Sequence, residues 1–423
     1  MTKAGTRTGV RTGARTGTRK SGRVGPLVAQ PVGAPDLDVD ALLADPDTRI
    51  IVCCGSGGVG KTTTSAALAL RAAEQGRKVV VLTIDPARRL AQSMGIEKLD
   101  NTPRPVPGLA PSDDATAGSL DAMMLDMKRT FDDVVESQAS PEKAQQILQN
   151  PFYVALSSSF AGTQEYMAME KLGQLHADAR ATGRWDLIVV DTPPSRSALD
   201  FLDSPERLSS FLDGRFIRLL LAPAKGPARL MTAGLNVITG ALTKILGASV
   251  LRDVQTFVAA LDTLFGGFRQ RAQRTYQLLQ APGTAFVVVA APEPDALREA
   301  AYFVERLSEE QMPLAGLVVN RASRAPRGAL SPDQATAAAE RLEEQESSAG
   351  DGAPTAGLTA GLLRLHADRG RIVARETRLR KRFSTAHPDV ATAVVPALST
   401  DVHDLDGLRR VGDLLAAHAG PAA

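Results

Sequence analysis

The chain has 423 residues, of which 43% are hydrophobic and only 4% aromatic, and its formal net charge is +2. This length suits one large α/β domain or two ordinary ones, and the scarcity of aromatic side chains predicts an aliphatic core. Residues 1–35 hold seven basic and no acidic side chains, so removing these seven charges from +2 leaves −5 for the rest. A mildly acidic body argues against a nucleic-acid partner, because nucleic-acid grooves need clustered positive charge.

Residues 1–35 form a basic tail that contains a four-residue Arg-Thr-Gly repeat starting at Arg7. The tail has almost no apolar content and cannot bury a core, so we predict that it is disordered. It lacks the apolar centre of a secretory signal and only weakly matches an organellar transit peptide. Two interpretations stay open: a solvated tail without a defined role, and weak binding to an acidic surface.

Six apolar runs have the length and the β-branched content of buried strands. Helical patterns separate them, which predicts an α/β fold with a doubly wound, mostly parallel sheet in residues 36–423. Ligands of such sheets bind beyond the carboxyl ends of the strands. The six runs are residues 49–54, 78–84, 187–191, 285–291, 314–320 and 392–398.

Two connections between these runs are much longer than a single crossover helix requires. They are rich in helical patterns, among them residues 121–135 and 162–180. We therefore predict a helical subdomain, built from the inserts at about 115–183 and 204–280, on the nucleotide side of the sheet.

Two later segments have simpler predictions. Residues 346–357 are rich in Ser, Gly and Ala and predict a flexible loop. The basic stretch 371–382 that follows predicts a solvated helix face.

The chain has two cysteines, Cys53 and Cys54, which are adjacent in an apolar run. Neighbouring strand residues point to opposite faces, so we predict a structural role for both rather than metal ligation, in a reducing compartment. The longest weakly charged apolar stretch, residues 230–251, contains Lys244, and no stretch reaches the ~18 uncharged residues of a membrane span. These features together predict a cytoplasmic protein.

A glycine-rich loop, GSGGVGKT, follows the first predicted strand at residues 55–62 and fits the pattern G-x-x-x-x-G-K-[ST]. Its backbone N–H groups and the N-terminus of the next helix are suited to phosphate oxygens. Lys61 should reach the β- and γ-phosphates, and the Thr62 hydroxyl should hold Mg²⁺. We thus predict ATP and Mg²⁺ as cofactors. The predicted contacts are Gly55, Ser56, Gly57, Gly58, Val59, Gly60, Lys61, Thr62 and Thr63.

Two acidic residues end neighbouring runs. Asp85 follows the run 78–84, where its carboxylate could orient or deprotonate an attacking water. An equally good reading is a helix N-cap, because Asp followed by Pro begins helices well. Asp191 ends the run 187–191, and an acid at this place in a phosphate-loop protein usually binds Mg²⁺ directly or through water.

Taken together, these motifs resemble the ATPase family of arsenite-pump motor subunits and of targeting factors for tail-anchored membrane proteins. The resemblance covers about residues 48–415, within the phosphate-loop class that has a deviant Walker A loop. Its segments are GGVGKT (57–62), TIDPA (83–87), GTQEYMAME (162–170), DTPP (191–194), APEPDALREA (291–300) and VVPAL (394–398).

The resemblance implies roles for single residues. Asp85 would position the catalytic water beside Lys61, and Asp191 would be the Mg²⁺-linked switch acid. Asn320 would contact the adenine, and Pro396 would flank it. The resemblance also implies a dimer that opens and closes with ATP.

The chain departs from the family at Ser56, where the family has a signature lysine that reaches the partner's nucleotide. A hydroxyl cannot supply that positive charge. Three explanations stay open: a slow active site, a substitute in Arg88 or Arg89, and a dimer with a paralogue that keeps the lysine, which we favour. With two adjacent cysteines, neither the thiol cluster of an arsenite site nor a paired-cysteine zinc site is expected.

The inserts are rich in methionine and could form a groove for a hydrophobic helix, although the same residues could simply pack the subdomain. The residues are Met123, Met124, Met127, Met167, Met169, Met231, Leu219, Leu220, Ile238 and Ile245.

We expect an ATPase that handles hydrophobic or membrane-protein clients, with transient contact with the membrane. One alternative is the motor subunit of an anion transporter. Another is an ATPase like those that partition chromosomes or place the division site, although the mixed-charge C-terminal segment lacks the basic amphipathic helix this would use.

Overall fold

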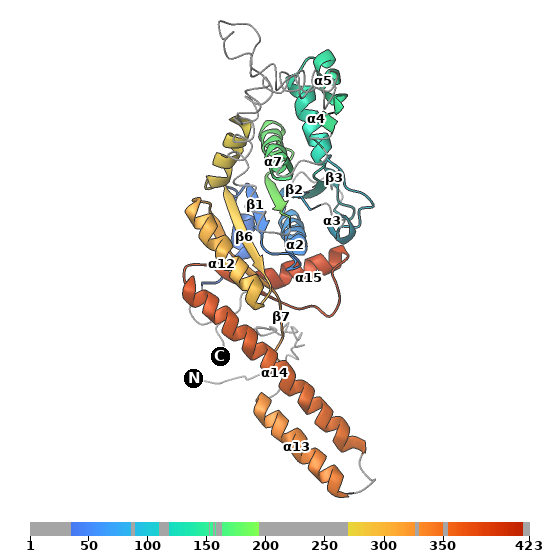
Figure 1. Cartoon of the computed structure of the whole chain (residues 1–423), viewed down its shortest axis with the longest axis vertical. Helices are drawn as coiled ribbons and strands as arrows, with labels where there is room; N and C mark the ends of the chain where they lie inside the picture. Colours follow the sequence, from blue (N-terminus) through green and yellow to red (C-terminus); the bar gives the residue numbers. More distant parts are fainter. Residues whose placement is uncertain are drawn as a thin grey trace, which may run out of the picture.

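The computed structural model shows an eight-stranded sheet with helices on both faces (Figure 1). It describes residues 35–85, 89–109, 118–193 (with gaps at 152, 155–156 and 158–162), 270–325, 330–349 and 354–417. The predicted basic tail and most of the second insert lie outside these residues, and their predicted states remain predictions.

The strands follow the spatial order β3-β4-β2-β5-β1-β6-β7-β8, and every neighbouring pair is parallel except β3 with β4. Six of the eight strands are those predicted, with slightly shifted ends, so the predicted doubly wound sheet is confirmed. The central strands are apolar throughout because helices cover both of their faces. The strands are β1 (Ile50–Cys54), β2 (Lys78–Thr83), β3 (Arg104–Pro105), β4 (Ser119–Met124), β5 (Leu187–Asp191), β6 (Thr284–Ala290), β7 (Leu314–Ala322) and β8 (Thr392–Pro396).

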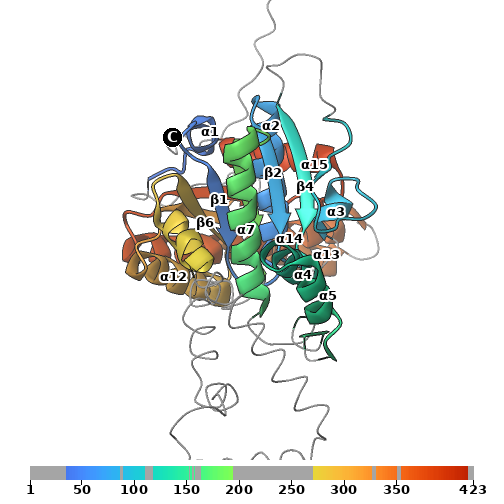
Figure 2. The same cartoon turned by 90° about the horizontal axis from the view of Figure 1, so that it is seen from above.

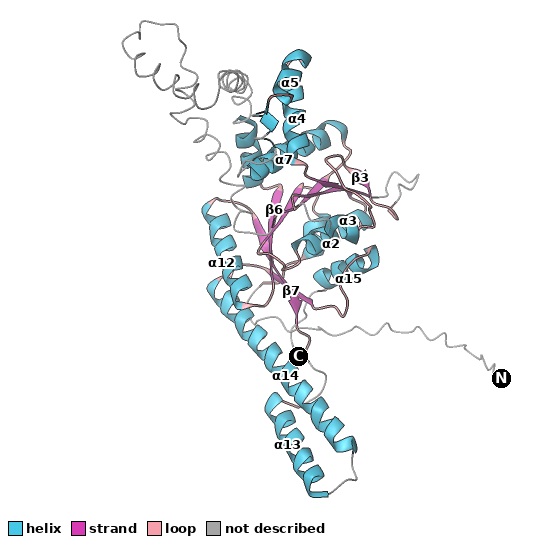
Figure 3. Ribbon diagram, turned by 45° about the vertical axis from the view of Figure 1, so that its right-hand side comes forward, coloured by secondary structure: helices cyan, strands magenta, loops and turns pink. Residues whose placement is uncertain are grey.

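Helices α2 and α15 pack together on one face of the sheet, and α7 and α12 cover the other face (Figures 2 and 3). The described chain begins beside β8, where Leu37 N donates to Thr392 O. None of the helices in the described ranges combines the length and apolar character needed to cross a bilayer. The helices are α1 (Val39–Ala44), α2 (Lys61–Glu74), α3 (Arg89–Ser93), α4 (Met127–Gln138), α5 (Pro141–Leu148), α7 (Thr163–Thr182), α12 (Pro294–Glu309), α13 (Pro332–Ala349), α14 (Pro354–Ala386) and α15 (Leu405–Ala416).

The prediction of a helix over residues 121–135 is wrong at its beginning. Residues 119–124 form β4, which pairs with β2, and the helix α4 begins only at Met127. The run SLDAMM does not look like a buried strand because it contains an acid. That acid, Asp121, is tolerated at 8% exposure because its Oδ2 accepts hydrogen bonds from Trp185 Nε1 at 2.9 Å and Arg184 at 2.8 Å.

The described residues that follow β4 in the first insert are mainly helical. Helices α4 and α5 lie beyond the carboxyl ends of β2 and β4 (Figure 2), while α7 runs across the sheet itself. In the second insert, residues 270–280 are helical and residues 204–269 lie outside the described ranges. A separate helical subdomain therefore stays a prediction.

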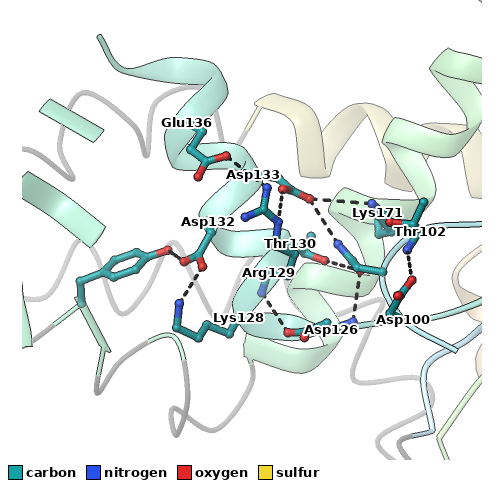
Figure 4. A network of polar contacts seen from close by, with 12 residues as sticks. Asp100, Thr102, Asp126, Lys128, Arg129, Thr130, Asp132, Asp133, Glu136 and Lys171 are labelled. Atoms are coloured by element: carbon teal, nitrogen blue, oxygen red, sulfur yellow. Dashed lines mark hydrogen bonds and ion pairs between the residues drawn. The ribbon is translucent and has the colours of Figure 1, made fainter. Parts of the chain in front are cut away.

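A polar network joins the start of α4 to the preceding loop and to α7 (Figure 4). Asn101, which is 7% exposed, accepts hydrogen bonds on Oδ1 from Asp126 N at 3.1 Å and Thr130 Oγ1 at 3.0 Å. Its Nδ2 donates to Asp133 at 3.2 Å, and Lys171 of α7 lies 4.0 Å from the same carboxylate. One buried amide thus joins its loop to three groups at the start of α4, and Asp133 extends the network to α7.

Replacing Asn101 with alanine should lower the free energy of unfolding by about 2–3 kcal/mol, because the buried Thr130 hydroxyl loses its acceptor. Urea denaturation of the two proteins measures the difference. Thr102→Ala is the matched control, since this neighbouring side chain is exposed, and it should change stability by less than about 0.5 kcal/mol. Equal effects of the two substitutions would contradict the assigned role of the amide.

Helices α13 and α14 form a hairpin that extends away from the sheet (Figures 1 and 3). Buried alanines such as Ala339 and Ala367 allow the two helices to approach closely. The predicted loop at 346–357 is wrong at both ends, because residues 346–349 continue α13 and residues 354–357 begin α14. Packing between the helices overrides the weak helix preference of glycine and serine there.

The predicted solvated face at 371–382 is mostly exposed, as expected. Arg380 is the exception, because it is only 3% exposed where α14 reaches the body of the protein. A basic residue in a mostly exposed stretch can thus be buried by tertiary contact.

Candidate functional site

The glycine-rich loop lies at the carboxyl edge of the sheet and joins β1 to α2. Gly55, Gly58 and Gly60 have φ angles of +146°, +77° and +96°, which residues with side chains rarely adopt. A Cβ on Gly55 would lie 2.1 Å from the Val289 carbonyl oxygen. A Cβ on Gly60 would lie 2.2 Å from Asn320 Nδ2. The backbone of β6 therefore requires glycine at position 55, whereas the positive φ angle is what favours glycine at position 58. Loops of this kind present successive N–H groups to an anion.

Lys61 is the first residue of α2 and is only 6% exposed. Its Nζ donates to the Ser56 carbonyl oxygen at 2.8 Å, across the loop. Burial lowers the pKa of this ammonium, and the nearby carboxylates of Asp191 and Asp85 oppose that change. The lysine is thus held at the loop with a single, replaceable oxygen partner.

Asp191 is fully buried at the end of β5, beside the ends of β1 and β2. Its Oδ2 accepts hydrogen bonds from Thr62 Oγ1 at 2.8 Å and Thr83 Oγ1 at 2.9 Å. Within the described part of the chain, its Oδ1 has no hydrogen-bond partner although it is buried. Burial raises the pKa of this carboxyl to about 6, against the lowering effect of the two hydroxyls and Lys61.

The donor atoms around Asp191 fit a magnesium ion. A buried carboxylate oxygen without a protein partner, next to the Thr62 hydroxyl, is a set of hard oxygen ligands. Mg²⁺ usually takes only one or two protein oxygens and completes its shell with water and phosphate oxygens, so a small set suffices.

The high pKa of Asp191 predicts a pH dependence of stability. A carboxyl whose pKa is raised from 3.8 to about 6 holds its proton more tightly in the folded state. Its contribution to stability is therefore present below about pH 4 and is lost as the pH rises through about 6.

Between about pH 4 and about pH 7, the free energy of unfolding of the wild type should fall by roughly 3 kcal/mol more than that of Asp191→Asn. Both proteins are measured without nucleotide or Mg²⁺. Urea denaturation of both proteins across this range measures the difference. Parallel stability curves would contradict it.

Asp85 follows β2 and is half-buried. Its carboxylate lies near enough to raise the pKa of both Lys61 and Asp191. Gln164 of α7 holds the same turn by donating to Ile84 O at 2.9 Å. The structure therefore brings together three of the predicted residues that are distant in sequence.

Of the two arginines predicted as possible substitutes for the lysine, the structure describes only one. Arg88 lies outside the described residues, and Arg89 is exposed at the start of α3. Whether either arginine substitutes for the absent lysine remains a prediction.

Asn320 and Pro396 lie on the neighbouring strands β7 and β8. Asn320 is 8% exposed, and its Nδ2 donates to Val59 O at 2.9 Å. Pro396 is buried at the end of β8, opposite Ala322. Asn320 thus contacts the loop, and the contact of both residues with an adenine remains a prediction.

Arg321 also contacts the loop, although it was not among the residues predicted from the sequence. Its φ is +61°, and its Nη1 donates to Gly58 O at 3.0 Å. No local motif marks it, because the contact depends on the turn of the backbone after Asn320. A positive φ at a residue other than glycine often marks a functional constraint.

A cavity of about 390 Å³, which no sequence motif predicts, lies beside the loop and is lined by Arg321 among other residues. Ser56, Gly57 and Gly58 line one side of it. Four acidic residues line it as well: Glu293, Asp295, Glu299 and Glu376. Ser56, which lacks the positive charge of the family's lysine, thus lines a cavity rich in carboxylates.

Cys53 and Cys54 are free thiols buried in β1, as a packing role requires, and Cys54 Sγ donates to Val287 O at 3.9 Å. Burial raises the pKa of Cys53 to about 12 and raises that of Cys54 as well, because a thiolate is disfavoured there. Neither is therefore a reactive thiol.

The predicted methionine groove is not formed by the residues that the structure describes. Met123, Met167 and Met169 are 0% exposed and belong to the core, as in the packing alternative. Met124 and Met127 are partly buried against it. Met231, Leu219, Leu220, Ile238 and Ile245 lie outside the described residues.

The arrangement defines a class of protein. A parallel sheet whose first strand leads through G-x-x-x-x-G-K-T into a helix, with an acid ending the adjacent strand, is the mark of a phosphate-loop nucleoside triphosphatase fold. Residues 48–328 match the anion-transporting ATPase family, and the chain belongs to this family. The family resemblance stated from the motifs is confirmed.

Three of the proteins to which the chain is similar at low identity carry ATPase names. An ATPase ASNA1 homolog of Cryptosporidium parvum is 28% identical over 268 residues, 63% of this chain and 63% of that protein. An arsenical pump-driving ATPase of Acidiphilium multivorum is 30% identical over 161 residues, 38% of this chain and 26% of that protein. An ATPase GET3 of Podospora anserina is 27% identical over 285 residues, 67% of this chain and 76% of that protein. The chain thus spans less than two thirds of the first two relatives.

Proposed function

We propose that this protein is a Mg²⁺-dependent ATPase that converts ATP and water to ADP and phosphate. The observation that carries the proposal is the buried Asp191, which is bonded to Thr62 and has one open carboxylate oxygen beside the loop. The ATPase names of three relatives support the same reaction.

Different residues would bind the phosphates and the Mg²⁺ ion. The loop N–H groups would hold the β- and γ-phosphates. Lys61 would exchange the Ser56 carbonyl oxygen for phosphate oxygens, where its charge offsets the charge that develops during transfer. Thr62 and Asp191 would hold Mg²⁺, which neutralises phosphate charge when bound.

Asp85 would position the attacking water. Its carboxylate is half-buried, near Lys61 and Asp191, on a turn held by Gln164. The helix-cap alternative stays open, because the residues that follow Asp85 lie outside the described ranges. Asn320 and Pro396 would meet the adenine on the far side of the loop.

The absence of the signature lysine bears on the partner. The cavity beside Ser56 contains four carboxylates. Such a surface would attract a positive side chain brought by another protomer. We therefore propose a dimer with a paralogue that keeps the lysine, and that opens and closes with ATP.

Two biological roles are candidates for this ATPase, and each is supported by different relatives. Hydrophobic or membrane-protein clients are our first candidate, and the similarity to ATPase GET3 and ASNA1 homologs is the support for it. The alternative is a transporter motor, which the arsenical pump-driving relative favours. With both cysteines buried, the chain's own thiols offer no arsenite site in that role.

Phosphate release from ATP by the purified protein tests the proposed reaction. Wild type should release phosphate with Mg²⁺ and stop when the metal is chelated, whereas Asp85→Asn should bind ATP and release phosphate about 10²-fold more slowly. Asp389→Asn, which removes an exposed carboxylate between α14 and β8, is the control and should retain the wild-type rate. Binding of ATP without Mg²⁺-dependent release in both the wild type and Ser56→Lys would refute the proposed ATPase.

Ser56→Lys tests the proposed partner. If a lysine from a paralogue is what the chain lacks, the variant should form a dimer with itself in ATP and release phosphate at least about tenfold faster than wild type. Sedimentation velocity with and without ATP, together with phosphate release, gives both results. A wild-type protein that already dimerises and turns over at the variant's rate would contradict the need for a paralogue.

A further inference from the structure

The first half of α14 carries a row of exposed apolar side chains. Leu358, Leu362, Leu365 and Ile372 are 66%, 59%, 60% and 45% exposed. Steps of four, three and seven residues place them on one side of a helix, at the first and fourth positions of a heptad. Arg369 takes the position that the pattern leaves between Leu365 and Ile372. We call these five residues the α14 seam.

The seam faces away from α13. The α14 residues that are buried in the first half of the hairpin, Ala360 and Ala367, lie on the opposite side of the helix. The hairpin projects from the body, and α13 is the described helix that runs beside this half of α14 (Figures 1 and 3). No described element therefore covers the seam.

The side of α14 that carries the seam is buried further along the helix. Phe383 is 6% exposed where α14 reaches the body. One turn beyond Ile372, the Glu376 carboxylate accepts hydrogen bonds from Ser323 N at 2.8 Å and Ser323 Oγ at 2.7 Å. Glu376 also lines the acidic cavity beside the loop. The seam thus continues an internal packing surface and ends next to the candidate site.

Charge decides what could cover the seam. Between Leu358 and Ile372, α14 carries three arginines and one acid, and two of the arginines are already paired, Arg364 with Glu343 and Arg371 with Asp368. Arg369 and Arg375 are exposed, and neither forms an ion pair with a carboxylate in the described residues. Residues 1–35 contain no acidic side chain that could pair with Arg369, and the seam of a second copy would add another arginine rather than a carboxylate.

The width of the seam also limits its occupant. A helix that lies on a membrane presents a broad apolar face, commonly with aromatic residues. The seam is a single heptad row of leucine and isoleucine with an arginine inside it. A charged residue within such a row sets the register of a partner helix.

We propose that the α14 seam docks an amphipathic helix of another protein, whose apolar row is flanked by carboxylates and places one of them opposite Arg369. The docked helix would lie along the exposed half of α14. Its end would come within one turn of Glu376, the residue that joins α14 to the segment after β7.

Two synthetic peptides probe the full-length protein by fluorescence anisotropy. Both have four heptads with leucine at the first and fourth positions, and they carry either glutamate or lysine at the flanking positions. The glutamate peptide should bind at least about tenfold more tightly than the lysine peptide. The substitution Arg369→Glu should reverse this preference.

The double substitution Leu362→Gln, Leu365→Gln should weaken binding of the glutamate peptide by about 100-fold, because two exposed apolar contacts are removed. Leu330→Gln is the matched control, since this leucine is 46% exposed but lies before α13, and it should bind like wild type. Both variants should keep the wild-type circular dichroism spectrum, because the changed side chains are exposed.

Three results would overturn the proposal. The two peptides could bind equally, which would remove the charge argument. Sedimentation could show a dimer of the wild type that the double variant loses, which would make the occupant a second copy. Vesicles of phosphatidylglycerol and phosphatidylcholine could bind the wild type and not the double variant, which would make it a lipid surface.

Discussion

Lys61→Ala is expected to slow ATP hydrolysis by about 10³-fold and to leave the fold intact. The lost charge is the one that would contact the β- and γ-phosphates, and groups in such positions contribute on the order of 10²–10⁵ in rate. The stability should not fall with the activity. Burial lowers the pKa of Lys61, so holding its charge in the folded protein is unfavourable before nucleotide binds.

Phosphate release and urea denaturation, measured on the same preparation, separate these two effects. Lys78→Ala is the matched control, since Lys78 is exposed at the start of β2 and should change neither quantity. A variant of Lys61 that hydrolyses ATP within about threefold of wild type would remove the lysine from the mechanism. Loss of both activity and fold would instead make the Lys61–Ser56 hydrogen bond structural.

The strand ends show how much of the site could be predicted from sequence. Asp191 follows a run of apolar residues, and Thr62 follows a recognisable loop, so both could be assigned to one edge of a parallel sheet. Their hydrogen bond joins residues 129 positions apart and depends on the register of β1 with β5. The sequence alone does not specify that register, so only the folded structure shows that Oδ1 of Asp191 lacks a hydrogen-bond partner among the described residues.

Strand β4 and the buried contacts of Glu376 were not predicted, and both depend on residues that are distant in the sequence. Strand β4 was hidden because Asp121 interrupts its apolar run, and only the tertiary bonds to Arg184 and Trp185 make that acid tolerable. Glu376 was read as part of a solvated helix, yet it bonds Ser323 across 53 residues and lines the cavity. In both cases a distant partner reverses the local preference, which no window of sequence can show.

Gly55→Ala is expected to lower the free energy of unfolding by about 3–5 kcal/mol and to abolish ATP binding. Two costs add. The φ of +146° is strained for a residue with a side chain, and the new Cβ would lie 2.1 Å from the Val289 carbonyl oxygen. That oxygen belongs to the backbone of β6, which pairs with β1 and β7 on either side and cannot move away.

Gly58→Ala separates the two costs within the same loop. Its φ of +77° is also positive, but a Cβ there meets no atom within 4 Å. This control should lose only about 1–2 kcal/mol, the cost of the left-handed conformation alone. Urea denaturation gives the stabilities, and titration with a fluorescent ATP analogue gives the binding. If the two variants lose the same stability, the close approach of β1 to β6 is not what demands Gly55, and the loop selects glycine only for its backbone conformation.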